Sequence, residues 1–225
     1  PAQTPVSLRY NFNNYAEETG LISYQINSTV QDDEGYIWIA SNEGLQRFDG
    51  IRFKNFRPVA NDSSTIPSKS ILQLLFDNNK NLWLLTIEGR IGVFNTKTFE
   101  FKEADVQVIN TDLLGSLSSS KRLITDAYGN IFLLLLGKEL VTYSPRNNTF
   151  TASNNFFLPN PEWKIVDFVQ QPDTKKYWMC IADMGFAVYD SANGQLSYHG
   201  KNSGQEKIIE QYQKTTINFR QIWVR

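Results

Sequence analysis

The sequence contains little of the chemistry on which most metal centres and nucleophilic enzymes depend. Among its 225 residues there is one cysteine, Cys180, and one histidine, His199. A single cysteine excludes an intrachain disulfide framework and a zinc site built from several cysteines. The formal net charge is −1, so electrostatics give no case for a nucleic acid or an anionic membrane surface as partner.

Long apolar runs are absent as well. The longest candidate, Ile131 to Leu136, has the length of a strand and falls far short of the roughly 18 apolar residues that cross a bilayer. The composition, with 41% hydrophobic, 20% charged and 13% aromatic residues, is that of a globular protein and excludes general disorder. A chain of this length forms either one all-β domain or two ordinary domains.

What the chain does contain is a repeated pattern. Four segments align on an aromatic residue: VQDDEGYIWIAS, LFDNNKNLWLLT, ITDAYGNIFLLL and VQQPDTKKYWMC. The aromatic anchors follow one another at intervals of 45, 49 and 46 residues, and they are Trp38, Trp83, Phe132 and Trp178. Six residues before each anchor lies a residue that favours turns, namely Asp32, Asp77, Asp126 and Pro172.

Each repeat has the pattern strand, turn, apolar strand, second turn, strand, hairpin turn and strand. In the first repeat Gly35 and Gly44 mark the two turns, and Asp49-Gly50 supplies the positive φ angles of a tight hairpin. The runs IWIA, LWLL and IFLLLL are apolar on both faces, as expected of strands buried between two sheets. Four strands in every 40 to 50 residues, roughly, are typical of a β-propeller blade.

The predicted fold is therefore all-β, a β-propeller of four-stranded blades in which each anchor aromatic packs against the adjacent blade. A two-sheet β-sandwich is the alternative, but it does not predict the common register. We expect blades at residues 25–60, 68–104, 116–153 and 163–200. Residues 8–24 are expected to supply the outer strand of a closing blade and a lead-in, and residues 215–225 the first strand of a truncated blade.

Four blades with two partial ones do not close a ring, and open sheet edges invite pairing with another chain. We therefore interpret the chain as a fragment of a larger propeller of roughly seven blades. Little of the sequence has a helical period. The exception is residues 205–214, which are expected to form either a short helix or a long loop between repeats.

The first repeat, NSTVQDDEGYIWIASNEGLQRFDG at residues 27–50, resembles the two-component regulator propeller repeat, in which Asp-x-x-Gly-x-x-Trp precedes a Gly-Leu pair. Residues 69–95 are similar to it. The third and fourth repeats depart from the pattern, because Phe132 replaces the tryptophan and Pro172 replaces the turn aspartate. The lead-in at residues 12–30 also resembles the segment that opens the periplasmic sensor of hybrid two-component systems in gut Bacteroidetes.

The resemblance implies a longer receptor, with two large propellers and a β-sandwich outside the membrane and a histidine kinase and DNA-binding response regulator inside. Such receptors typically sense oligosaccharides released from polysaccharides and switch on the genes that import them. The chain would be a periplasmic, non-catalytic part of the sensor, with no cofactor, no bound metal and no direct contact with nucleic acid. Its partners would be an oligosaccharide, the remaining blades and domains of the receptor, and a second receptor copy in a homodimer.

Three features of the sequence are candidate chemical sites. Asp32, Asp33 and Glu34 carry oxygen atoms of the kind that bind calcium, but the equivalent turns lose most of these carboxylates, which favours a structural turn. His199 lies at the predicted outer edge of the fourth repeat, and no nucleophile elbow of the Gly-x-Ser-x-Gly type accompanies it. Cys180 lies in an apolar strand, which favours a buried, inert thiol.

Ligands of propellers usually contact loops on one face. The loops between repeats at residues 57–67 and 155–163 are therefore the candidates for contact with a ligand. Trp163, Phe156 and Phe157 are the candidate ligand-binding residues, as a platform for a sugar ring, although core packing or a contact with a second blade is the favoured interpretation of each. Two other functions stay open. One is a propeller lyase or glycosidase, for which no motif supplies a carboxylate pair, and the other is a protein–protein scaffold.

Overall fold

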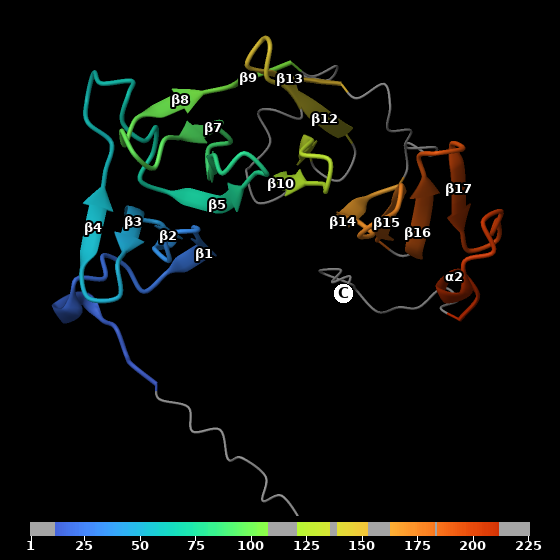
Figure 1. Ribbon diagram of the computed structural model, residues 1–225, viewed down its shortest axis with the longest axis horizontal. Helices are drawn as coiled ribbons and strands as arrows, with labels where there is room; N and C mark the ends of the chain where they lie inside the picture. The colour runs from blue at the N-terminus through green and yellow to red at the C-terminus, as the bar shows by residue number, and fades with distance from the viewer. Residues whose placement is uncertain (1–11, 108–120, 136–138, 153–162, 183, 212–225) are drawn as a thin grey trace, which may run out of the picture.

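The computed structural model describes residues 12–107, 121–135, 139–152, 163–182 and 184–211. Within these ranges the chain forms 17 strands, one short 3₁₀ helix and one short α-helix. The strands make four sheets that follow one another in chain order along an arc (Figure 1). Successive sheets of this kind, each meandering from an inner to an outer strand, are the blades of a β-propeller.

Each blade orders its strands as they occur in the sequence. Blade 1 contains β1 (Ile26–Gln31), β2 (Ile37–Ser41), β3 (Gly44–Phe48) and β4 (Phe53–Phe56). Blade 2 contains β5 (Ile71–Phe76), β6 (Leu82–Thr86), β7 (Ile91–Phe94) and β8 (Phe101–Glu103). Blade 3 contains β10 (Lys121–Thr125), β11 (Ile131–Leu135), β12 (Glu139–Ser144) and β13 (Thr149–Ala152). Blade 4 contains β14 (Ile165–Gln170), β15 (Lys176–Ile181), β16 (Gly185–Asp190) and β17 (Gln195–Tyr198).

The second strand of each blade is apolar on both faces because each face meets a different neighbour. On β6, Leu82 and Leu84 pack in the core shared with blade 1. Trp83 and Leu85, which alternate with them, pack in the core shared with blade 3. This alternation of side chains across a strand explains why the run LWLL lacks the polar positions of a half-exposed strand.

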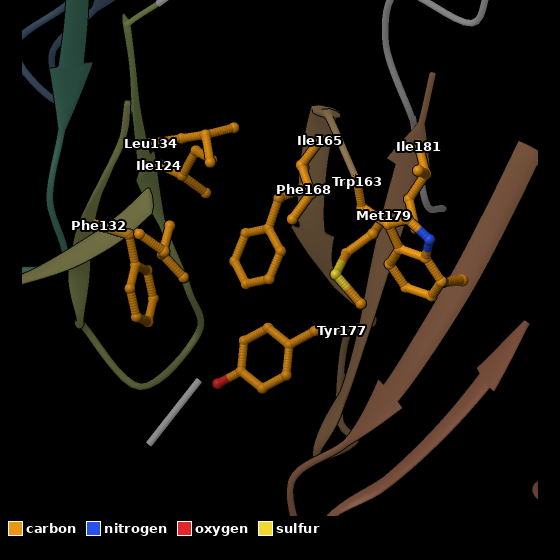
Figure 2. Packing of buried hydrophobic residues seen from close by; sticks show 11 residues of the cluster. Ile124, Phe132, Leu134, Trp163, Ile165, Phe168, Tyr177, Met179 and Ile181 are labelled. Atoms are coloured by element: carbon orange, nitrogen blue, oxygen red, sulfur yellow. The ribbon is translucent and has the colours of Figure 1, made fainter. Parts of the chain in front are cut away.

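The hydrophobic cores therefore lie between blades. Figure 2 shows the core between blades 3 and 4, where Phe132 and its neighbours face Phe168, Tyr177 and Met179. Phe132 meets Phe168 edge-on with ring centroids 5.7 Å apart, and Phe168 stacks on Tyr177 at 5.2 Å. Trp38 packs in the equivalent core between blades 1 and 2. Trp38, Trp83 and Phe132 thus pack against the following blade, as predicted.

A short strand crosses from blade 2 to blade 3. After β8, residues Asp105–Val106 form β9, which pairs in parallel with β13 at the outer edge of blade 3. The side chain of Asn148 secures the crossing, because its Nδ2 donates to the carbonyl oxygen of Glu103 at 2.7 Å. The strand covers a sheet edge that would otherwise expose unpaired backbone groups.

Partial blades were predicted at both ends of the chain. Residues 8–11 and 215–225, where we expected partial blades, lie outside the described residues. Residues 12–15, the rest of the expected outer strand, form no strand in this structure, and the lead-in contains a 3₁₀ helix, η1 (Glu17–Thr19). Of the two structures expected at residues 205–214, the described part adopts the helix, α2 (Lys207–Gln211).

Candidate functional site

The acidic turn of blade 1 is held together by its first carboxylate. Asp32 Oδ1 accepts hydrogen bonds from the backbone amides of Glu34 (3.0 Å) and Tyr36 (2.9 Å). Its Oδ2 accepts a hydrogen bond from Trp38 Nε1 at 2.8 Å. Gly35 completes the turn with a φ of 87°. The carboxylate therefore ties the turn to the anchor tryptophan, and both of its oxygen atoms are engaged within the protein.

The same arrangement recurs in blade 2. Asp77 Oδ1 accepts from the backbone amides of Asn79 and Asn81, both at 2.9 Å. Its Oδ2 accepts from Asn81 Nδ2 at 2.9 Å and from Trp83 Nε1 at 3.0 Å. Asp77 is buried, so this network satisfies a charge that would otherwise be costly to bury.

In blade 3 the anchor is Phe132, which has no N–H group to donate. Asp126 Oδ2 instead accepts from Asn130 Nδ2 at 2.7 Å and from the Tyr177 hydroxyl of blade 4 at 3.0 Å. Burial, with the Asp126 carboxylate adding to it, raises the pKa of Tyr177. The phenol therefore stays protonated and acts as the donor, and the loss of the tryptophan is compensated by a bond between blades.

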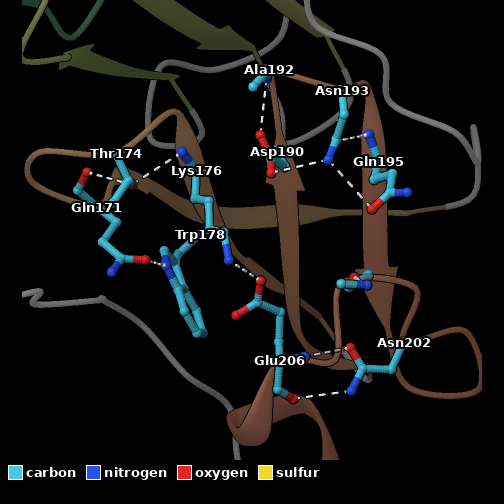
Figure 3. Close-up of polar contacts among 12 residues, drawn as sticks. Gln171, Thr174, Lys176, Trp178, Asp190, Ala192, Asn193, Gln195, Asn202 and Glu206 are labelled. Atoms are coloured by element: carbon cyan, nitrogen blue, oxygen red, sulfur yellow. Dashed lines mark hydrogen bonds and ion pairs between the residues drawn. The ribbon is translucent and has the colours of Figure 1, made fainter.

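In blade 4 an amide oxygen takes the place of the carboxylate. The group that accepts the hydrogen bond from Trp178 Nε1 is Gln171 Oε1, at 3.0 Å, and Pro172 does not take this part (Figure 3). The backbone bond that closes the turn runs from Gln171 N to Lys176 O. The turn therefore contains one residue more than the other three, and Pro172 lies within it, as expected of a residue that favours turns.

Replacing Asp77 with asparagine is expected to destabilise the protein by about 2 kcal/mol, because the amide presents N–H donors to the Trp83 indole and the Asn81 amide. Chemical denaturation followed by tryptophan fluorescence measures the change in free energy of unfolding. Asp33→Asn is the matched control, since the ion pair that Asp33 forms with Lys80 is exposed and contributes about 0 to 1 kcal/mol. Equal effects of the two variants would contradict the assigned role.

A second repeated position escaped the sequence analysis. On the first, innermost strand of each blade, one polar residue pairs with a residue of the second strand. That partner follows the anchor aromatic by two positions. These residues are Ser28, Gln73, Arg122 and Asp167, and they lie ten residues before the anchor in the first three blades and eleven before it in blade 4. The spacing common to the first three blades was the available signal, but the four residue types share no chemistry that a pattern search would detect.

These side chains join each blade to the next. Ser28 Oγ accepts from the backbone amide of Leu74 at 3.1 Å. Gln73 makes two bonds of 2.8 Å to the backbone of Leu123, one as donor and one as acceptor. Arg122 forms an ion pair of 3.1 Å with Asp167, whose side chain is only 3% exposed. The inner strands are thus linked by polar contacts as well as by the cores behind them.

A cavity of about 660 Å³ lies between blades 1 and 2. Three turns line it, at residues 32–36, 77–81 and 95–97, together with Arg47. Phe76, Val93 and Phe94 give it an apolar patch, and most of the remaining lining is polar, with amide, carboxylate and cationic side chains. A cavity of this size and mixed lining suits a small polar ligand that also has an apolar face.

The candidate ligand residues fall elsewhere. Trp163 is 8% exposed and packs edge-on against Tyr198, with ring centroids 5.1 Å apart, in the core of Figure 2. Its indole therefore presents no open face to a ligand. Phe156 and Phe157 lie outside the described residues. The cavity lies at the C-terminal end of β5. The loop at residues 57–67, a candidate from the sequence, lies before the N-terminal end of this strand.

The two residues of catalytic type have ordinary surroundings. His199 is exposed directly after β17. Cys180 is buried in β15. A separate prediction concerned Gly44, the expected turn glycine, which opens β3 with a φ of 141°. Among the described residues, no group of three or more histidine, cysteine, aspartate and glutamate side chains is arranged to hold a metal ion.

Cys180 is expected to resist thiol reagents in the native protein at mildly alkaline pH. Burial raises the pKa of this thiol to about 12, and the neighbouring Asp167 carboxylate adds to the shift, so the reactive thiolate is scarce. Labelling with a chromogenic disulfide before and after denaturation measures the difference. Rapid reaction of the folded protein would contradict the prediction.

Comparison with known proteins agrees with this architecture. Residues 20–43 match the two component regulator propeller family, whereas no curated protein sequence matches the chain. The extracellular domain of a hybrid two component system from B. thetaiotaomicron has a TM-score of 0.63 at 16% identity, over 82% of this chain and 26% of that one. A structure of YCF48 bound to D1 peptide has a TM-score of 0.53 at 15% identity, over 79% of this chain and 55% of that one.

A third structure, the extracellular domain of a one component system from B. thetaiotaomicron, has a TM-score of 0.47 at 16% identity, over 89% of this chain and 31% of that one. The chain thus spans about a quarter to a third of the two B. thetaiotaomicron structures. At these identities the likeness concerns the fold, and it confirms the predicted propeller. In the part of the chain that the structure describes, no helix is long and apolar enough to cross a membrane.

Proposed function

We propose that this chain, whose first blade carries a two-component regulator propeller repeat, is part of the ligand-sensing propeller of a hybrid two-component receptor. The observation that carries the proposal is the match at residues 20–43, which covers β1, β2 and the Asp32 turn between them. The propeller fold, shared with the extracellular domain of such a system, supports it. On this proposal the region lies in the periplasm, and its parent is a histidine kinase.

The ligand we propose is an oligosaccharide whose arrival regulates genes for polysaccharide use. The cavity between blades 1 and 2 supports this choice, because an apolar patch beside many amide and charged groups suits the two kinds of surface on a sugar ring. A ligand there touches two blades at once. It would therefore favour one relative placement of the blades, which is what a sensor requires, and a receptor homodimer would carry the change across the membrane.

The carboxylates of the cavity favour sensing over hydrolysis. A glycosidase needs two carboxyl groups placed across the sugar. Asp32 and Asp77 direct their oxygens into their own turns, and Asp33 pairs with Lys80. Within the described lining, Glu34 is left as the one carboxylate that no ion pair or turn engages.

The test is calorimetric titration of the purified chain with a panel of plant, host and microbial oligosaccharides, followed by chromatography of each mixture. We expect at least one member to bind and to be recovered intact. Release of shorter products would identify a propeller enzyme instead. Failure of every member to bind would exclude the function of oligosaccharide sensor and favour that of a protein–protein scaffold.

A further inference from the structure

We propose that the saccharide site of the cavity continues across the turns of the blades as far as Tyr128, whose ring stacks on a sugar unit beyond the cavity. The inference rests on the proposed function and extends its ligand from one that fills the cavity to a longer oligosaccharide. The surface that would carry this ligand is built from the turns between the first and second strands of the four blades.

These turns contact one another in the order of the blades. They comprise residues 32–36, 77–81, 126–130 and 171–175, and together we name them the turn face. Lys80 of the second turn forms an ion pair with Asp33 of the first. Asn78 Nδ2 of the second turn donates to the carbonyl oxygen of Ala127 in the third at 3.2 Å, and the third turn contacts the fourth through Tyr128. The turn face is therefore continuous across the four blades.

The cavity reaches the turn face and is open to solvent there. The first two turns, at residues 32–36 and 77–81, line it, and Asn78 is part of this lining. The third turn packs against the same asparagine, because a Cβ added at Gly129 would lie 3.5 Å from Asn78 Nδ2 and 3.7 Å from Asn78 Cβ. A ligand that leaves the cavity across Asn78 therefore meets the turn at residues 126–130.

Tyr128 presents an aromatic ring at this point. It is 58% exposed, and among the residues of the four turns it is the one exposed aromatic residue. Its backbone amide donates to Asp126 Oδ1 at 3.0 Å, and its hydroxyl donates to the carbonyl oxygen of Thr174 in blade 4 at 3.4 Å. The ring is thus held at both ends. Because a tyrosine held in this way loses little conformational freedom when a ligand binds, its exposed face suits a stacking contact.

The chemistry of the turn face matches an uncharged oligosaccharide. A sugar ring has a face of C–H groups that stacks on an aromatic ring, and hydroxyl groups that bind amides. The second and third turns carry exposed amides, such as Asn79 and Asn130, which both donate and accept hydrogen bonds. The charge of the cavity is nearly balanced, because its lining holds four carboxylates and three cationic side chains. Successive neutral sugar units would therefore contact the cavity, the amides and the Tyr128 ring.

The test uses ladders of neutral oligosaccharides from starch, cellulose, xylan and arabinan, each running from the disaccharide to the octasaccharide. Titration calorimetry with the purified chain measures the affinity for each member. In at least one ladder we expect the affinity to rise at least ~10-fold once the oligosaccharide is long enough to reach Tyr128. Tyr128→Ala should remove most of that rise and leave the affinity for the short members unchanged.

Tyr128→Phe is the matched control, because it keeps the ring and removes the hydroxyl that contacts Thr174. It should bind as the parent does, and so should Tyr24→Ala, which removes an exposed tyrosine before β1, outside the turn face.

Four results would overturn the inference and leave the proposed function standing. They are an affinity of the parent that does not rise with length, a Tyr128→Ala variant that binds every member as the parent does, a loss that is equal at every length, and a Tyr128→Phe variant that loses as much as Tyr128→Ala. Binding of no saccharide, here or in the wider panel, would overturn both.

Discussion

Alanine at position 92 is expected to prevent blade 2 from forming its native sheet. Gly92 lies in β7 between β6 and β8, where it pairs with Leu84 and Glu103. An added Cβ would meet the Lys102 carbonyl oxygen at 2.2 Å and the Phe101 ring at 2.7 Å. Contacts with neighbouring backbone cannot be relieved by a rotamer change, so the strands must separate. We expect a loss of about 3 kcal/mol or more, at the severe end for overpacking.

Chemical denaturation followed by tryptophan fluorescence measures this loss. Gly194→Ala is the control, because a Cβ there meets nothing and the residue instead has a φ of 70°. It should cost about 1 to 2 kcal/mol, the penalty for a left-handed conformation. A Gly92→Ala protein as stable as the Gly194→Ala protein would show that the sheet has room at position 92.

Truncation of Trp83 to alanine is expected to cost about 3 to 5 kcal/mol, the range for large aromatic residues in a core. The indole is 1% exposed and packs edge-on against Tyr143 of blade 3, with ring centroids 4.6 Å apart. Its removal empties the core between blades 2 and 3 and leaves Asp77 without one of its donors. Thermal and chemical unfolding of the variant check the loss.

Trp83→Phe separates packing from hydrogen bonding. The ring keeps most of the apolar contacts, and Asp77 Oδ2 retains the Asn81 amide, so the cost should be about 1 to 2 kcal/mol. The chain already uses phenylalanine at the equivalent position in blade 3, Phe132. A phenylalanine variant as unstable as the alanine variant would mean that the hydrogen bond from the indole N–H to Asp77, and not the packing of the ring, accounts for the contribution of Trp83 to stability.

The blade repeat could be predicted because its signals are local. A turn aspartate and an aromatic residue six positions later recur in three of the four units, and each pair joins through one short turn. In the fourth unit the turn is longer by one residue, and Gln171 accepts there the indole hydrogen bond that Asp32 and Asp77 accept in blades 1 and 2. Nothing in local composition distinguishes a turn of one length from the other.

The cavity could not be predicted, because it is assembled from turns that belong to different blades. Phe99, which follows the cavity-lining turn at residues 95–97, takes a left-handed conformation that sequence rules assign to glycine or asparagine. Lys80 does the same, with a φ of 64°, at the turn position that Gly35 and Gly129 occupy in blades 1 and 3. Such departures are imposed by tertiary contacts, so a pattern of residue types does not reveal them.

The crossing strand β9 makes the junctions between successive blades differ in the kind of contact that joins them. β9 follows blade 2 in the chain and pairs at the edge of blade 3, so sliding one blade past the other must break its backbone hydrogen bonds to β13. Among the described strands, none of blade 1 pairs with a strand of blade 2, and side chains such as Ser28 bridge that junction. The junction between blades 2 and 3 therefore has backbone hydrogen bonds in addition to side-chain contacts, whereas hydrogen bonds of side chains such as Ser28 join the two blades that line the cavity.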